Sequence, residues 1–507
     1  MSPVRSPARM RRAAPAFDQR VAAAVVFAAT MFISIMDVTI VNVALPSIAR
    51  DFGASTGSIE LVVIGYLVSL AVFIPASGWL GDRFGTKRVF LAALAAFTAA
   101  SVLCGAATSL DALVGFRVLQ GVGGGILMPV GTTMLFRAFP PEQRVRAARV
   151  VIVPTVIAPA AGPVLGGILT DHLSWHWVFL VNLPVGLAVF VFGLVFLAEH
   201  REPAAAGRFD LAGFVLAATG FALILYALSS GPSSGWTSAK VGVAGSVGLA
   251  ATALMVIWER RRDRPLLALR LLGERLFRST NLTMMFATMA FLGTLYLIPL
   301  FLQDARGANA TTAGLALFPE ALGVLAGSQL AGRGYPRMGP RRLMVFGPLL
   351  VAATLTLISR MDLATSMWLI RVMMFFVGAG MGFIFLSAQT AAFARISPVD
   401  TGQASTLFNM QRQLASALGV AVVTTALTLF APAGAKTTAA AAGNVAAYHG
   451  AFLVAAGLAV VATVFALTVR DSDAANTMRP RTPDGPTAAG TDDRTDDKAD
   501  GGIPVAA

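Results

Sequence analysis

Two ionisable side chains in this sequence stand where a charge is costly. Asp37 and Arg117 each lie inside a long run of apolar residues. Burial disfavours the ionised carboxylate of Asp37, whereas a nearby guanidinium favours it. Two opposed effects of this kind suit a carboxylate that binds and releases a proton. We therefore expect Asp37 and Arg117 to form a proton-coupling pair, and the alternative is a static ion pair that only fixes helix packing.

A second set of polar residues also interrupts apolar runs, later in the chain. Glu320 follows Pro319 inside one run and suits a cationic substrate or a second proton; the alternative is that it lies in a wet vestibule. Arg412 lies near the start of another apolar run, together with two amide side chains. Polar side chains within a membrane span face a cavity rather than lipid. The candidates for a substrate or second proton site are Glu320, Arg412, Asn409 and Gln413.

Other kinds of site are not indicated. The four His are scattered along the chain, and a single Cys cannot build a Cys-based zinc site, so we expect neither a metal nor a cofactor. No nucleophile stands with a base, and no phosphate-binding loop suggests ATP drive, so we expect no enzyme. The net charge of +13 is spread over many short clusters, which argues against a nucleic-acid partner.

The elements that must position these residues are membrane spans. Of the 507 residues 56% are apolar and only 13% are charged, and the mean hydropathy is +0.73. A span needs roughly 20 apolar residues. The sequence therefore predicts an all-α integral membrane protein with fourteen transmembrane helices, near 22–45, 58–78, 89–108, 112–136, 150–170, 177–198, 209–229, 240–258, 279–302, 313–332, 343–360, 366–389, 406–430 and 448–469.

The positive charges orient these spans. With both termini in the cytoplasm, cytoplasmic segments hold 31 Lys and Arg residues and external segments hold 5. We expect a multi-pass protein of the cytoplasmic membrane in that orientation. Asp37 then lies roughly 12 Å and Arg117 roughly 9 Å from the outer ends of their helices, because each residue adds about 1.5 Å. The two side chains are expected at similar depth.

The chain carries an internal repeat at an offset of 254 residues. Adding 254 maps Gly85 onto Gly339 and Arg117 onto Arg371, and it also maps Gly78, Arg83, Lys87 and Arg88 onto Gly332, Arg337, Arg341 and Arg342. Arg371 lacks the Gln-Gly that follows Arg117, which favours a structural relic of the repeat. Two parallel six-helix halves with a site between them are a transporter architecture.

The repeat defines the expected domains. They are a basic cytoplasmic N-terminus over 1–20, an N-terminal six-helix half over 21–198, and a C-terminal six-helix half over 279–470. Between the halves, 199–278 holds two inserted helices and an amphipathic linker along the cytoplasmic membrane surface. Residues 471–507 are polar and Pro-containing, which predicts a disordered cytoplasmic tail.

Several motifs together resemble one family. They are DVTIVNVALP (37–46), GWLGDRFGTKR (78–88), RVLQGVGGG (117–125), GPVLGG (162–167) and WHWVFLVNLP (175–184). The sequence resembles the major facilitator superfamily, in its fourteen-span drug:proton antiporter branch, the EmrB/QacA group. His176 departs from that pattern, where the family more often has Arg.

The resemblance implies roles for two motifs. At the turn between the second and third spans, the resemblance implies that Asp82 and Arg83 contribute to a charge latch between the halves. The whole conformational motif there comprises Gly78, Asp82, Arg83, Gly85, Lys87 and Arg88. In the fifth span, an antiporter motif that seals the path against proton leak is implied for Pro159, Gly162, Pro163, Gly166 and Gly167. A topological anchor and ordinary helix packing are the respective alternatives.

The expected function is a proton-coupled antiporter that exports lipophilic or amphipathic drugs or antibiotics. Its partners are the lipid bilayer, protons and a small lipophilic or cationic substrate, and we expect a monomer. Two alternatives remain open at this point: a solute:proton symporter of the same fold, and a non-transporting membrane sensor.

Overall fold

A computed structural model describes residues 18–53, 59, 61–201, 208–262, 265–308, 310–431 and 444–478. Every regular element in these ranges is a helix. In chain order they are α1 (Gln19–Phe52), α3 (Leu61–Phe84), α4 (Thr86–Gly105), α5 (Leu110–Ala138), η1 (Pro141–Gln143), α6 (Arg144–His172), α7 (His176–Leu180), α8 (Asn182–Phe196), α10 (Leu211–Ser234), α11 (Ala239–Arg260), η2 (Leu269–Gly273), α12 (Arg275–Leu300), η3 (Phe301–Ala305), α13 (Ala310–Ile358), α14 (Met367–Ala392), α15 (Thr401–Leu429), α17 (Val445–Leu467), η4 (Asp471–Ala474) and α18 (Ala475–Met478).

Twelve helices in the described part are long and apolar enough to cross a membrane. One of them, Thr312–Ile358, passes through Gly339, whose backbone is not helical. Large apolar side chains remain exposed on the outside of the bundle, for example Leu187 and Val195 on α8 and Leu249 on α11. A soluble protein would hide most such residues from water, so this surface is suited to lipid.

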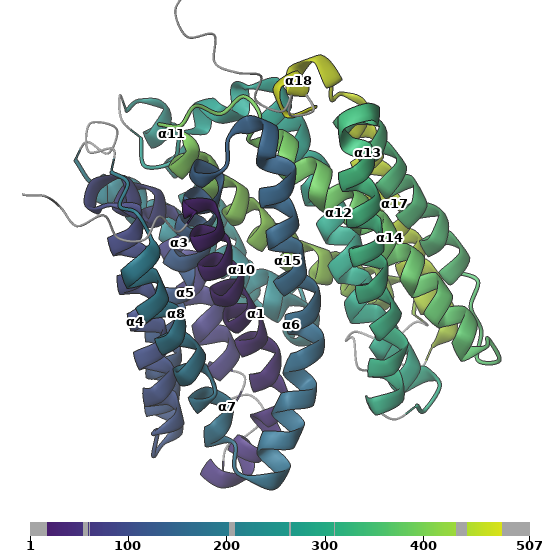
Figure 1. Ribbon diagram of the computed structural model, residues 1–507. Helices are drawn as coiled ribbons and strands as arrows, with labels where there is room; N and C mark the ends of the chain where they lie inside the picture. Colours follow the sequence, from purple (N-terminus) through teal and green to yellow (C-terminus); the bar gives the residue numbers. More distant parts are fainter. Residues whose placement is uncertain are drawn as a thin grey trace, which may run out of the picture.

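The helices pack in two groups of consecutive elements. In the N-terminal group, α1 contacts α6 and α5 contacts α3 and α4; in the C-terminal group, α12 contacts α15 and α17, and α13 contacts α14. Figure 1 shows the purple-to-blue helices of the first group beside the green-to-yellow helices of the second. This grouping follows the two repeats expected from the sequence.

The repeat is visible in two turns of matching geometry. Gly85, between α3 and α4, has φ of 102°, and Gly339, within α13, has φ of 77°. Only glycine adopts such angles freely. A carboxylate caps the helix that follows each turn: Glu199 accepts from the backbone N–H of Lys87 at 3.1 Å, and Asp471 accepts from that of Arg341 at 2.9 Å. We call the end of the bundle that carries both turns the turn end.

The two helices between the groups pack beside them. α10 contacts α11, and it also contacts α3 of the first group and α15 of the second. The indole N–H of Trp236, which follows α10, donates to Oγ1 of Thr425 on α15 at 2.8 Å. The inserted pair therefore covers one of the two lines along which the groups meet.

The groups meet at the turn end and diverge away from it. Ser77 Oγ lies 3.2 Å from Thr406 Oγ1, and the ring of Phe136 stacks on that of Phe393 at 4.4 Å. Figure 1 shows the helices of the two groups separating toward the end that carries α7. The molecule is thus joined at the turn end, and we call the other end, with α7, the open end.

Two expected segments differ in detail from the structure. Residues 471–478, the start of the expected disordered tail, form η4 and α18, held by the Asp471 cap and by a 3.0 Å contact between Thr477 Oγ1 and Tyr335 Oη. The expected linker 259–278 begins within α11 and ends within α12, with η2 between them. The remainder of the tail, 479–507, and most of the basic N-terminus, 1–17, lie outside the described residues.

Candidate functional site

Asp37 and Arg117 are in direct contact inside the N-terminal group. The Arg117 Nη1 lies 2.6 Å from Asp37 Oδ2, and both side chains are at most 1% exposed. The second carboxylate oxygen, Oδ1, accepts from Gln120 Nε2 at 2.9 Å and from Asn182 Nδ2 at 2.8 Å. Each oxygen of Asp37 therefore has a donor, as an ionised carboxylate requires when it is buried.

Arg117 has partners besides Asp37. Its Nε donates to the carbonyl of Val62 at 3.2 Å and its Nη1 donates to Gln120 Oε1 at 2.7 Å. The guanidinium also lies 4.2 Å above the ring of Tyr66, a cation–π geometry. If Asp37 took up a proton, these contacts would still hold Arg117. We call Asp37, Ser101, Arg117, Gln120 and Asn182 the Asp37 cluster; Ser101 Oγ accepts from Asn182 at 3.0 Å.

The cluster draws on four helices, and sequence reasoning found only two of its members. Gln120 follows Arg117 by three positions, so it lies on the same face of α5, and this spacing was a usable signal. Asn182 begins α8, directly after the short helix α7. Its contact with Asp37 depends on how α8 is rotated against α1, which no spacing within the sequence reports.

Glu320 lies on α13, away from the Asp37 cluster. Its side chain is half-buried, and within the described residues it has neither an ion pair nor a hydrogen bond. The helix there packs closely on α14, because Gly378 presents no side chain to the backbone of Glu320. Glu320 lies ten residues after Ala310, the first residue of α13, which is roughly 15 Å along the helix. A carboxylate at this depth without a partner is suited to a cation or a proton.

The three polar residues of α15 do not share one environment. Asn409 is 6% exposed and donates to the carbonyl of Ser405 at 2.9 Å and to Oγ1 of Thr132, in the other group, at 3.4 Å. It thus lies where the groups meet. Arg412 and Gln413 are half-buried and have no hydrogen bond or ion pair within the described residues.

The turn motif contributes a contact between the groups. Asp82 is 3% exposed and pairs with Arg137 at 3.0 Å, and Arg137 also donates to the carbonyl of Pro398 at 3.2 Å. A Cβ added at Gly402, near the start of α15, would lie 3.2 Å from Asp82 Oδ2, so the carboxylate sits at the positive end of that helix. Sequence reasoning missed Arg137.

Other members of the turn motif act within their own group. The Lys87 ammonium donates to the carbonyls of Leu194 and Leu197 at 2.8 and 2.7 Å, and Arg88 lies 3.6 Å from Glu199. The carbonyl of Arg83 accepts from Arg201 at 3.1 Å. Gly78 borders the other group, since a Cβ there would lie 2.8 Å from Thr406 Oγ1.

The glycines of α6 bring that helix against α1. A Cβ at Gly162 would overlap Oγ1 of Thr39 and lie 2.8 Å from its Cβ, and one at Gly166 would lie 3.0 Å from the carbonyl of Ile40. Gly167 has open space beside it. Pro159 and Pro163 belong to the same continuous helix. Gly162 therefore lets α6 approach α1 at Thr39, two residues after Asp37.

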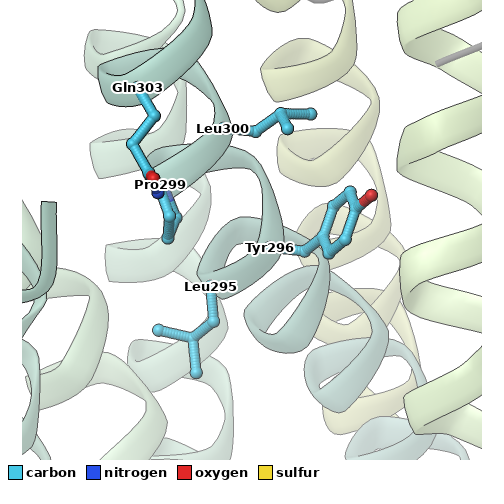
Figure 2. A pocket seen from close by; sticks show the side chains of 5 residues that line it. All are labelled: Leu295, Tyr296, Pro299, Leu300 and Gln303. Atoms are coloured by element: carbon cyan, nitrogen blue, oxygen red, sulfur yellow. The ribbon is translucent and has the colours of Figure 1, made fainter. Parts of the chain in front are cut away.

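A pocket of about 270 Å³ opens along the last turns of α12 and into η3. Figure 2 shows its five lining side chains, which are mostly apolar with one phenol and one amide: Leu295, Tyr296, Pro299, Leu300 and Gln303. This mixture suits a small amphipathic group. Neither the Asp37 cluster nor the polar residues of α15 line it.

Known proteins share this sequence and architecture. The sequence pattern of the Major Facilitator Superfamily matches residues 27–420. The multidrug resistance protein B homolog of Mycobacterium tuberculosis is 34% identical over 389 residues, which cover 75% of this chain and 71% of the relative. The putative multidrug resistance protein MdtD of Cronobacter sakazakii is 35% identical over 379 residues, covering 75% and 80%.

A solved structure has the same fold. The human organic anion transporter MFSD10 superposes with a TM-score of 0.64 at 14% identity, covering 88% of this chain and 99% of its own. A likeness at this identity concerns the fold alone. With two repeated groups of helices and a buried polar cluster in the first of them, the chain belongs to the Major Facilitator Superfamily of membrane transporters.

Proposed function

We propose that this transporter exports lipophilic or amphipathic drugs or antibiotics in exchange for protons. The observation that carries the proposal is the ion pair of Asp37 with Arg117, fully buried inside the N-terminal group. Relatives named multidrug resistance proteins support drugs as the substrate class. The mixed lining of the pocket at the end of α12 suits such molecules.

The cluster suggests how a proton is exchanged. In the conformation joined at the turn end, Asp37 has the partners of an ionised carboxylate. Protonation would remove the charge that attracts Arg117, whose remaining contacts to Val62, Gln120 and Tyr66 would hold it in place. A change in this pairing biases the packing of α1 against α5, and with it the angle between the groups.

We further propose fourteen spans in the orientation set by the positive charges. The count takes the twelve candidate helices, divides α13 at Gly339, and adds α6. The turn end is then cytoplasmic and the conformation is open toward the outside. The domain limits 21–198, 199–278 and 279–470 follow from this assignment, with the chain acting as a monomer.

Glu320 is our candidate for a second site. A half-buried carboxylate without an ion pair in the described residues would attract a cationic substrate or a second proton. Arg412 and Gln413 on α15 are further candidates for ligand contact.

Inside-out vesicles with an acidic lumen test the proposal. Adding a lipophilic cation or antibiotic should release protons from wild-type vesicles, and Asp37→Asn should abolish the release. Asn281→Ala, which removes a buried amide bonded only to its own helix, is the matched control. Substrate that moves with protons in the same direction would instead establish the symporter, and the absence of any flux across the panel would favour a sensor.

A further inference from the structure

The second line of contact between the groups, along α6 and α13, carries uncompensated positive charge. Arg144 and Arg149 stand at the start of α6, Arg146 lies between them, and Arg333 stands on α13. None of the four has an ion pair within the described residues. We call these four residues the arginine cluster. The opposite line has no such excess, because Asp82 compensates Arg137 there.

Two of these arginines reach across to the other group. A Cβ at Gly332 would lie 2.6 Å from Cζ of Arg149, so the guanidinium lies directly against α13. Arg144 is only 7% exposed, and the carboxylate that acts on it is that of the exposed Glu142. The guanidiniums of Arg333 and Arg146 act on Arg149 as well, so like charges are crowded here.

The buried nitrogens of the cluster lack acceptors. Arg144 Nε and Nη1 and Arg149 Nε are buried without a hydrogen bond to any residue that the structure describes. An unsatisfied buried donor costs about 1–3 kcal/mol, and more when it is charged. Two neighbouring polar groups bring no negative charge: Tyr335 Oη is an uncharged phenol bonded to Thr477, and Gln143 Oε1 accepts from Arg20, which adds another positive charge. A missing anion would satisfy these donors.

We propose that the arginine cluster binds a phosphate group, carried by an anionic phospholipid, that bridges α6 and α13. Arginine forks match phosphate oxygens, and the first turn of α6 adds the positive end of a helix. Exposed apolar side chains follow on both helices, Ile157 eight residues after Arg149 on α6 and Leu330 three residues before Arg333 on α13, and an acyl chain would run along them. Such a bridge would hold the two groups together at the turn end.

The test measures thermal stability of the purified full-length protein in nanodiscs. Phosphatidylcholine discs with added phosphatidylglycerol should raise the melting temperature of the wild type, by mass action, above that in pure phosphatidylcholine. Arg149→Gln and Arg333→Gln should lose most of the rise; Arg333 is exposed, so this variant does not disturb the packing. Arg261→Gln, an exposed arginine of the same membrane side on the inserted pair, should keep it.

A second arm separates the sources of the phosphate. If inorganic phosphate reproduces the rise in pure phosphatidylcholine discs, and Arg149→Gln abolishes it, the site takes the phosphate group alone. Equal rises of the melting temperature in the wild type and in all three variants would overturn the proposal. The proposal would also be overturned if changing five aspartates of the tail to Asn lowered the melting temperature in phosphatidylcholine discs, because the acidic tail would then occupy the site. These residues are Asp492, Asp493, Asp496, Asp497 and Asp500.

Discussion

At the scale of single residues, three side chains donate to the carboxylate of Asp37. Arg117 contacts one oxygen, and Gln120 and Asn182 contact the other. Hydrogen bonds to the charged form of a carboxylate favour that form over the protonated one. If Asp37 exchanges a proton as we propose, the amides adjust how readily the proton leaves, while Arg117 supplies the counter-charge.

Removing one amide should shift the pH dependence. Asn182→Ala takes away one donor to the ionised form, so proton binding becomes easier and the midpoint of substrate-triggered proton release should move to higher pH. A hydrogen bond to a charged group is worth about 1.5–3 kcal/mol, so a shift of about one pH unit or more is expected. The measurement is a pH series in vesicles. An unchanged midpoint, as expected for Asn281→Ala, would contradict this role.

Tyr66 should matter through its ring and not through its hydroxyl. The ring lies 4.2 Å from the Arg117 guanidinium, but the buried Oη has no hydrogen-bond partner among the described residues. Tyr66→Phe should keep transport and leave stability equal or higher by up to about 1 kcal/mol, since an unsatisfied group is removed. Tyr66→Leu should reduce both. Thermal melting and drug efflux measure the two variants, and a loss in Tyr66→Phe would contradict the assignment.

At the scale of helices, close approach of α1 and α6 depends on one glycine. A Cβ at Gly162 would overlap Thr39, which lies two residues from Asp37. Gly162→Ala should therefore separate the helices, cost about 1–3 kcal/mol, and impair transport. Gly167→Ala on the same helix meets open space and is the matched control. Equal efflux and equal melting temperatures for the two variants would show that the contact is dispensable.

The helices themselves were predictable, but their rotations were not. Long apolar runs identified the spans, and counting residues from the ends of α1 and α5 placed Asp37 and Arg117 at one depth. Asn182 and Gln120 meet Asp37 only because α5 and α8 turn those faces toward α1. Asn409, a candidate for ligand contact, lies between the groups, because α15 packs against α5. Such contacts arise from tertiary packing, which spacing within one helix does not report.

At the scale of the whole molecule, the two groups are joined at one end. Ser77 and Thr406 lie in contact there, and the sequence holds a single Cys, so a cysteine-free background needs only Cys104→Ser. In that background Ser77→Cys with Thr406→Cys should form a disulfide on mild oxidation and stop efflux, with recovery after reduction. Each single cysteine variant should remain active. Oxidation that leaves efflux intact would show that the groups need not separate there.

The central claim is that the substrate displaces a proton from Asp37, and it can be measured without a membrane. Purified protein in detergent at neutral pH, in weak buffer with a pH indicator, should release protons when a lipophilic cation is added. Wild type and Glu320→Gln should both release protons, the latter at least in part, whereas Asp37→Asn should release none. Release from Asp37→Asn equal to that of wild type would contradict the account and move the exchanged proton to another group.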